Sequence, residues 1–271
     1  MFLIETDELK EKIDQVKIID CSWHMPQTKR NGLEEYKQNH LPNAIFFDLE
    51  KNSNKNSNLP HMLTDKNSWE IIVSEMGINN NDDIVIYDNS DVLSACRCWY
   101  NFIYFGHNPS LIHILNGGMK KWKHENKTTT NATSIVKKTK YYPNEIVNLV
   151  KNKKLIDENI TLQNFTVIDA RSKDRFEGKV PEPRQGLRSG SIPKSFCIPF
   201  EKLINDNNAF KDKDEIKKIF KEILKDITSS NVVFSCGSGI TACVLALAYC
   251  LINAKYMPII YDGSWAEYGK I

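Results

Sequence analysis

Four short sequence patterns occur twice along the chain in the same order, and this repeat restricts the fold more than any other feature. A buried-strand pattern ends in an acid at Asp20 and again at Asp169, and a proline after a leucine or isoleucine recurs at 42 and 193. A second strand pattern precedes residues 88 and 236, and a glycine before an aromatic stretch recurs at 117 and 263. The separations lie between 146 and 151 residues, which indicates a duplicated domain of about 120–130 residues.

Each copy alternates short apolar runs with amphipathic stretches. The apolar runs are continuous, which is typical of strands that are buried on both faces in a parallel sheet. The expected fold class is therefore α/β, with two tandem domains that each form a parallel sheet with helices on both faces. We expect a first domain over residues 1–124, a polar linker over 125–139 and a second domain over 140–271.

The composition excludes several classes of protein. Hydrophobic residues make up 41% and charged residues 26% of the chain, which is enough apolar material for folded cores. The formal net charge of +2 gives no support to a nucleic-acid partner. The longest apolar run, residues 244–252, is too short to span a membrane, and the N-terminus lacks the pattern of a signal peptide. We therefore expect no nucleic acid, no membrane and a cytoplasmic location.

The cysteine pattern favours neither disulfides nor a metal site. The chain has seven cysteines, an odd number, and no Cys-x-x-Cys pair, while its six histidines are scattered. We expect most of these thiols to be small buried side chains. They are Cys21, Cys96, Cys98, Cys197, Cys243 and Cys250.

The seventh cysteine lies where the two copies differ most. The second copy has the sequence CGSGITA at residues 236–242, and the first copy has DNSD at 88–91. Cys236 follows a buried strand, at the sheet edge where open α/β folds place their sites. Two glycines allow the loop to curl so that backbone N–H groups point inward, and a helix expected from Thr241 adds its positive end. Such a loop holds a thiolate or a persulfide, so Cys236 is the candidate nucleophile.

Two other motifs compete for this loop. Gly237, Gly239 and Ala242 match a dinucleotide-binding fingerprint, with Asp262 placed 20 residues further on for a ribose. Only nine residues follow Asp262, so the remaining strands of a nucleotide-binding sheet are missing downstream. A cysteine phosphatase needs Arg six residues after the Cys, and position 242 is Ala.

The chain resembles a known family at these motifs. The tandem repeat, CGSGITA and YDGSW at 261–265 resemble the two-domain rhodanese superfamily and, within it, the 3-mercaptopyruvate sulfurtransferases. HLP at 40–42, FFD at 46–48, PEPR at 181–184 and IP at 192–193 extend the resemblance over nearly the whole chain. The resemblance implies two rhodanese-like domains, an inactive first and a catalytic second, with the active site at their interface.

The loop sequence bears on the sulfur donor. The thiosulfate-preferring relatives place basic side chains directly after the Cys, whereas Gly237 and Ser238 are neutral here. Mercaptopyruvate carries a carboxylate, which a guanidinium binds through paired donors. Arg175 and Arg184 match the family's substrate-binding arginines, with Arg188 as the reserve candidate. The resemblance also assigns substrate binding to loop residues Gly237, Gly239, Ile240 and Thr241.

The family has a proposed Ser–His–acid relay that removes the proton of the substrate thiol. Ser238 matches the Ser and His61 matches the His, while the acid, usually Asp, falls on Glu50. The longer Glu50 departs from the pattern, and the adjacent Asp48 is an alternative. The plainer readings are a surface loop for His61 and a small hydroxyl that caps the loop or binds substrate for Ser238.

The resemblance implies a sulfurtransferase that moves sulfur from 3-mercaptopyruvate through a Cys236 persulfide, with release of pyruvate. The acceptor would be a thiol such as thioredoxin or a small thiol, or cyanide in an assay, and no metal or organic cofactor is needed. One alternative is a thiosulfate:cyanide sulfurtransferase on the same fold. A catalytically silent sulfur-carrier or binding module is the alternative from another class.

Overall fold

The computed structural model describes residues 2–271, which fold as two compact units. Unit 1 contains residues 2–54, 63–146 and 206–209, and unit 2 contains residues 55–62, 147–205 and 210–271. Both units therefore hold a short segment from the other half of the sequence. The segment 55–62 carries His61, one of the candidate site residues. The expected domain limits, with a linker at 125–139, stay a prediction.

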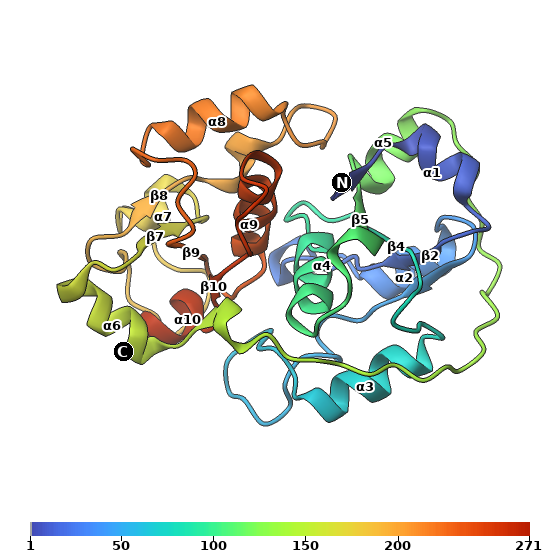
Figure 1. The fold of residues 1–271 in the computed structure, drawn as a ribbon, viewed down its shortest axis with the longest axis horizontal. Helices are drawn as coiled ribbons and strands as arrows, with labels where there is room; N and C mark the ends of the chain where they lie inside the picture. Colours follow the sequence, from blue (N-terminus) through green and yellow to red (C-terminus); the bar gives the residue numbers. More distant parts are fainter. Residues whose placement is uncertain (1) are drawn as a thin grey trace. The chain divides into compact units, whose positions relative to one another are not determined.

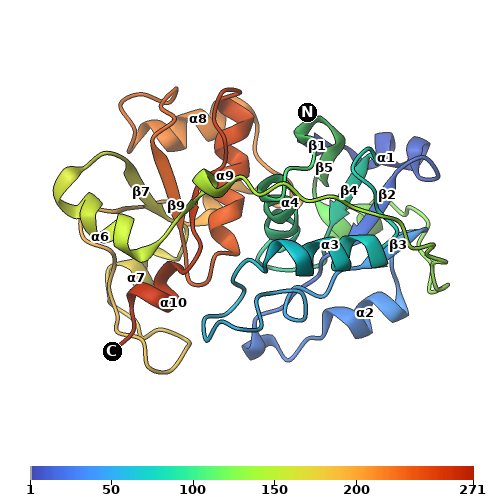
Figure 2. The same cartoon turned by 60° about the horizontal axis from the view of Figure 1, so that its bottom comes forward.

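Unit 1 is built on a five-stranded parallel sheet in the order β1-β5-β4-β2-β3 (Figure 1 and Figure 2). The strands pair in register along the sheet, with Asp20 at the end of β2 beside Tyr87 at the end of β4. The strands are β1 (Leu3–Ile4), β2 (Lys17–Asp20), β3 (Ala44–Phe46), β4 (Ile84–Tyr87) and β5 (Ile112–Leu115).

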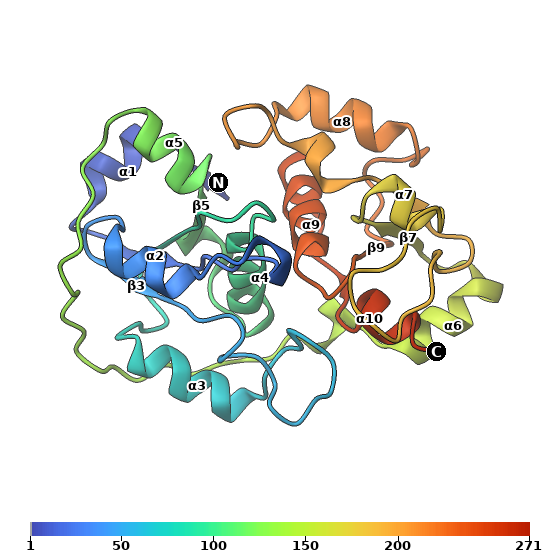
Figure 3. The same cartoon turned by 180° about the vertical axis from the view of Figure 1, so that it is seen from behind.

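Helices cover both faces of this sheet (Figure 3). On one face, α1, α2 and α5 pack on a core that includes Leu9, Val85 and Trp122. On the other face, Trp69 of α3 stacks on Phe105 and meets Phe102 of α4 edge-on. The helices are α1 (Thr6–Lys12), α2 (Gly32–Gln38), α3 (Lys66–Glu75), α4 (Ala95–Tyr104) and α5 (Gly118–His124), with 3₁₀ turns at Pro26–Thr28 and Pro109–Leu111.

Unit 2 repeats this plan with the strand order β6-β10-β9-β7-β8, of which Figure 1 labels β7 to β10. Its strands are β6 (Val150–Lys151), β7 (Thr166–Asp169), β8 (Phe196–Cys197), β9 (Val232–Ser235) and β10 (Ile260–Tyr261). Its helices are α6 (Lys153–Leu162), α7 (Lys173–Phe176), α8 (Lys213–Lys221), α9 (Thr241–Ile252) and α10 (Ser264–Tyr268), with 3₁₀ turns at Val147–Leu149 and Phe200–Leu203.

The two faces of the unit 2 sheet have separate cores. Val233 of β9 points to the side where Ile156 of α6 and Trp265 of α10 pack. Its neighbour Phe234 contacts Phe220 of α8 and Tyr249 of α9 on the opposite side. Successive side chains on a strand alternate between faces, so one apolar run supplies both cores. The predicted duplicated α/β fold is confirmed.

Helix α9 is apolar along its whole length because it is buried on nearly every side. Nine of its twelve residues are buried, including Cys243 and Cys250, which confirms the core position expected for these two thiols. Cys197 is only half-buried, at the end of β8, so the core position expected for it is wrong. Within residues 2–271, no helix is both long and apolar enough to cross a membrane.

Candidate active site

Two neighbouring strands of unit 2 bring the candidate residues to one edge of the sheet. β7 and β9 run parallel, with Asp169 paired to Ser235 at their carboxyl ends. Cys236 directly follows β9, and the segment after β7 carries Arg171, α7 and the 181–184 sequence. Ligand sites of open parallel sheets form at this edge, where loops replace the regular ladder.

The loop after β9 wraps around the sulfur of Cys236. The backbone N–H of Gly239 donates to Cys236 Sγ at 3.1 Å, and Gly239 adopts a φ of 79°, which a residue with a Cβ rarely tolerates. Ser264 Oγ accepts the Cys236 N–H at 3.1 Å, and the Trp265 N–H donates to the Cys236 carbonyl at 2.9 Å. The sulfur is therefore held in a fixed position, with the Cys236 residue 2% exposed.

Helix α9 begins at Thr241, as expected, and its first turn faces this loop. Ile240 precedes the helix and has no side chain that could cap the first N–H groups. The positive end of the helix is thus available to an anion in the loop. Cys243, one turn along, donates its thiol to the Gly239 carbonyl at 3.2 Å and supports the turn that holds the nucleophile.

The two predicted substrate-binding arginines lie over the loop. A Cβ atom built on Gly237 would lie 3.2 Å from Arg175 Nη2 and 3.8 Å from Arg184 Nη1. Arg184 Nη2 also donates to Ser238 Oγ at 3.4 Å. Glycine at position 237 therefore lets both guanidiniums approach the backbone beside the nucleophile.

A series of ion pairs holds the side chain of Arg175 in place. Glu182 Oε2 accepts from Arg175 Nη2 at 2.6 Å, and Glu182 Oε1 accepts from Arg171 Nη1 at 2.8 Å. Arg171 in turn donates three side-chain hydrogen bonds, at 2.8–3.1 Å, to the Asp169 carboxylate. The side chains of Glu182, Arg171 and Asp169 are at most 1% exposed, so these pairs are shielded from water.

Sequence reasoning missed Glu182. The signal that could have found it is its place between Pro181 and Pro183, two residues before Arg184. Prolines on both sides restrict the backbone and fix the direction of the acid before it meets a partner. Arg171, which had no assigned role, lies over the Trp265 ring at 4.4 Å.

Arg188, the reserve candidate, lies on aromatic rings. Its guanidinium lies 4.6 Å from the centre of the Trp265 ring and 5.5 Å from that of Tyr268. Its backbone carbonyl also accepts from Trp265 Nε1 at 3.0 Å. These contacts give Arg188 a packing role on α10.

His61 and Ser238 meet inside unit 2. His61 Nδ1 lies 2.9 Å from Ser238 Oγ, although 177 residues separate them in the sequence. Arg184 can only donate to Ser238 Oγ, and Ser238 Oγ and His61 Nδ1 share a hydrogen bond whose donor is set by the histidine tautomer. His61 is 2% exposed and has a φ of 60°, a left-handed conformation that persists only where the surroundings enforce it.

Glu50, the expected acid of the relay, belongs to unit 1. It follows β3, and its Oε1 accepts the Trp23 indole N–H at 2.8 Å. The alternative, Asp48, accepts the Lys51 N–H at 2.9 Å and closes a turn. The participation of Glu50 in the relay stays a prediction.

Other thiols of the chain are held in the protonated form by burial. Burial raises the pKa of Cys197 to about 12 and also raises the pKa values of Cys21 and Cys250. A thiol is nucleophilic as its thiolate, so these three are poor nucleophiles near neutral pH. None of them has a loop like the one around Cys236. Among residues 2–271, no group of His, Cys, Asp or Glu is arranged to hold a metal ion.

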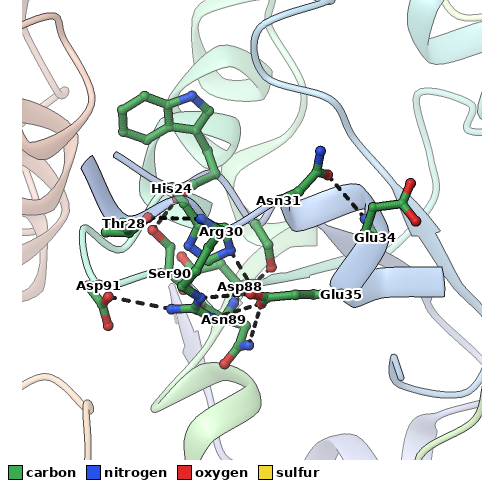
Figure 4. Close-up of polar contacts among 12 residues, drawn as sticks. His24, Thr28, Arg30, Asn31, Glu34, Glu35, Asp88, Asn89, Ser90 and Asp91 are labelled. Atoms are coloured by element: carbon green, nitrogen blue, oxygen red, sulfur yellow. Dashed lines mark hydrogen bonds and ion pairs between the residues drawn. The ribbon is translucent and has the colours of Figure 1, made fainter. Parts of the chain in front are cut away.

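The corresponding loop of unit 1 is bordered by side chains that bind one another (Figure 4). Arg30 binds both oxygens of Glu35 at 2.7 Å and donates to the Asn89 carbonyl at 3.0 Å. Asn89 Nδ2 also donates to Glu35, at 2.8 Å. The carboxyl of Asp88, at the position that corresponds to Cys236, accepts the N–H groups of Ser90 and Ala95. Unit 1 thus holds a carboxyl group where unit 2 holds a thiol.

Asp88 makes a specific contribution to the pH dependence of stability. Burial raises its pKa to about 7 from an ordinary 3.8, so the folded protein binds this proton more tightly than the unfolded chain. The free energy of unfolding therefore falls as pH rises from about 4 to 7, by about 1.4 kcal/mol per pH unit and about 4 kcal/mol in all. We expect Asp88→Asn to remove this part of the slope in urea unfolding measured from pH 4 to 8. An unchanged slope would contradict the assignment, and exposed Asp157→Asn is the control.

Known proteins share both the sequence and the fold of this chain. Residues 5–125 and 151–270 each match the rhodanese-like domain family. The Arabidopsis thaliana thiosulfate/3-mercaptopyruvate sulfurtransferase 1, mitochondrial, is 36% identical over 93% of this chain and 71% of its own length. The Mus musculus 3-mercaptopyruvate sulfurtransferase is 35% identical over 93% of this chain and 84% of its own length.

A solved structure is also similar to this chain in fold and sequence. The crystal structure of SseA from Escherichia coli, described as a 3-mercaptopyruvate sulfotransferase, matches with a TM-score of 0.87 at 30% identity. The match covers 98% of this chain and 100% of that one.

Proposed function

The chain belongs to the rhodanese family and is a sulfurtransferase, and we propose that it takes sulfur from 3-mercaptopyruvate and passes it through a Cys236 persulfide to a thiol. The observation that carries this donor is the pair of guanidiniums, Arg175 and Arg184, beside an otherwise neutral loop. A guanidinium offers the paired donors that a carboxylate accepts, and 3-mercaptopyruvate carries one carboxylate next to a ketone.

The first half-reaction builds the persulfide. The Cys236 thiolate attacks the donor sulfur and forms an S–S bond, while the S–C bond breaks and its electron pair passes to the pyruvate enolate. The two arginines and the loop N–H groups stabilise the negative charge that moves onto the leaving enolate. A proton on the enolate carbon then gives pyruvate, and Ser238 with His61 receives the proton of the donor thiol.

The second half-reaction transfers the sulfur to the acceptor. An acceptor thiolate attacks the outer sulfur of the persulfide and takes it, and the electron pair of the broken S–S bond restores the Cys236 thiolate. A small thiol or a protein thiol such as thioredoxin fits this step. No step of this scheme uses a metal or an organic cofactor.

The test is the intact mass of the protein after brief incubation with each donor, without reductant. We expect a gain of one sulfur, about 32 Da, with 3-mercaptopyruvate and a much slower gain with thiosulfate. A fast gain with thiosulfate alone would favour the second candidate, a thiosulfate sulfurtransferase, which the name of the Arabidopsis relative also covers. No gain with either donor would contradict sulfur transfer through Cys236.

A further inference from the structure

The guanidinium of Arg175 lies between Glu182 and the loop that holds Cys236. Its Oε2 accepts from Arg175 Nη2, the same nitrogen that lies 3.2 Å from a Cβ built on Gly237. Arg175 Nε also donates to Glu182 Oε1, at 3.2 Å, so the carboxylate binds that guanidinium along one edge. A donor anion bound by Arg175 therefore meets the charge of Arg175 and that of Glu182 together.

The position of Glu182 also prevents solvent from weakening its charge. Its side chain is 1% exposed, while Arg175 is 21% exposed and faces the site. A buried charge is screened by salt much less than a surface charge at the same distance. Arg171, its other partner, already has the Asp169 carboxylate, so Glu182 is not required to balance that guanidinium.

We propose that Glu182 is a specificity-determining residue, whose negative charge offsets part of the charge of Arg175 beside Cys236 and so biases the site toward donors with a single negative charge. This inference rests on the proposed function, because it explains how that site separates its two candidate donors. Mercaptopyruvate carries one negative charge and thiosulfate carries two. Each unit of donor charge is repelled by Glu182, so the dianion loses more affinity than the monoanion.

The direct test is Glu182→Gln, which keeps the shape and removes the charge. We expect the ratio of kcat/KM for thiosulfate to kcat/KM for 3-mercaptopyruvate to rise about three- to tenfold, as for the loss of one nearby charge in a partly wet site. The ratio cancels losses that both donors share, such as a looser Arg175. Glu182→Asp keeps the charge and should leave the ratio near the wild-type value.

The matched control is Glu177→Gln. Glu177 lies in the same segment, but its carboxylate pairs with Lys173 and Lys179 at the surface. Its removal should change the donor ratio by less than about twofold, since exposed pairs are screened by solvent. An unchanged ratio in Glu182→Gln, or an equal change in Glu177→Gln, would overturn the proposal.

A second readout does not depend on sulfur transfer. Iodoacetate and iodoacetamide both alkylate a thiolate, forming an S–C bond with loss of iodide, but only iodoacetate is charged. We expect Glu182→Gln to raise the iodoacetate-to-iodoacetamide rate ratio at Cys236 about three- to tenfold, followed on the Cys236 peptide by mass spectrometry. If the wild type accepts neither sulfur donor, the proposed function fails, while this ratio still reports the charge effect. A constant or lower ratio would show that Glu182 only positions Arg175.

A double variant controls for the chance that Glu182→Gln fails to fold. Glu182→Gln leaves the guanidiniums of Arg171 and Arg175 with fewer acceptors. We therefore also make Glu182→Gln together with Arg175→Gln, which removes one of these two guanidiniums. Compared with Arg175→Gln alone, the double variant should again raise the alkylation ratio at Cys236. The absence of a rise in this background would overturn the proposal even if the single variant did not fold.

Discussion

We expect that replacing Cys236 by Ser lowers kcat/KM for sulfur transfer at least about a thousandfold below that of the wild type. A serine hydroxyl is a far weaker nucleophile toward sulfur than a thiolate. The Gly239 N–H, which donates to Sγ in the wild type, would still find an acceptor in Oγ. The variant should therefore fold and should show no persulfide mass after incubation with donor.

The control for this prediction is Cys197→Ser. Cys197 is another thiol of unit 2, half-buried, with a pKa raised to about 12 and its Sγ donating to the Arg171 carbonyl at 3.3 Å. Serine can donate to the same carbonyl, so turnover should stay within about twofold of the wild type. If Cys236→Ser retained the persulfide mass and Cys197→Ser lost it, the nucleophile would be Cys197.

Arg184→Ala should lower kcat/KM for 3-mercaptopyruvate roughly 10- to 150-fold. A hydrogen bond to a charged group contributes about 1.5–3 kcal/mol, which corresponds to that range. Arg184 donates to Ser238 and approaches Gly237, so the loss should affect both capture of the carboxylate and the placement of the Ser238 hydroxyl. Steady-state kinetics with separate KM and kcat values would measure it.

Two variants separate the causes of that loss. Arg184→Lys keeps the charge and loses the paired donors, so a fall between those of wild type and Arg184→Ala would support bidentate capture. Lys179→Ala removes a cation from the same segment that pairs only with Glu177 in the described residues, and should leave kcat/KM unchanged within about twofold. An Arg184→Ala variant with wild-type kcat/KM would remove Arg184 from the site.

The fold could be predicted from the sequence because the same strand patterns occur in both copies. The strand patterns before Asp20 and Asp169 each indicated a buried parallel strand, and the structure has β2 and β7 at these positions. Thr241 as the start of a helix was also predictable, because the residues from 241 to 252 are apolar with no glycine or proline. Local patterns of this kind depend on neighbouring residues alone.

The structure added the contacts that depend on the fold. A lone Glu182 in a sequence is ordinarily a solvated side chain, and only the path of the chain after β7 places it between two guanidiniums. The contact between His61 and Ser238 joins residues 177 positions apart, so no local pattern could have placed it. The family resemblance assigned a role to His61, whereas it gave none to Glu182.

The contact of His61 with Ser238 has a consequence for dissecting the gene. The chain carries two copies of one fold, but His61 comes from a loop of the first copy's sequence and lies in the compact unit of the second. The two halves of the sequence therefore cannot be separated as independent modules without loss of this contact. A gene fragment that encodes residues 147–271 would keep Cys236 and lack that partner.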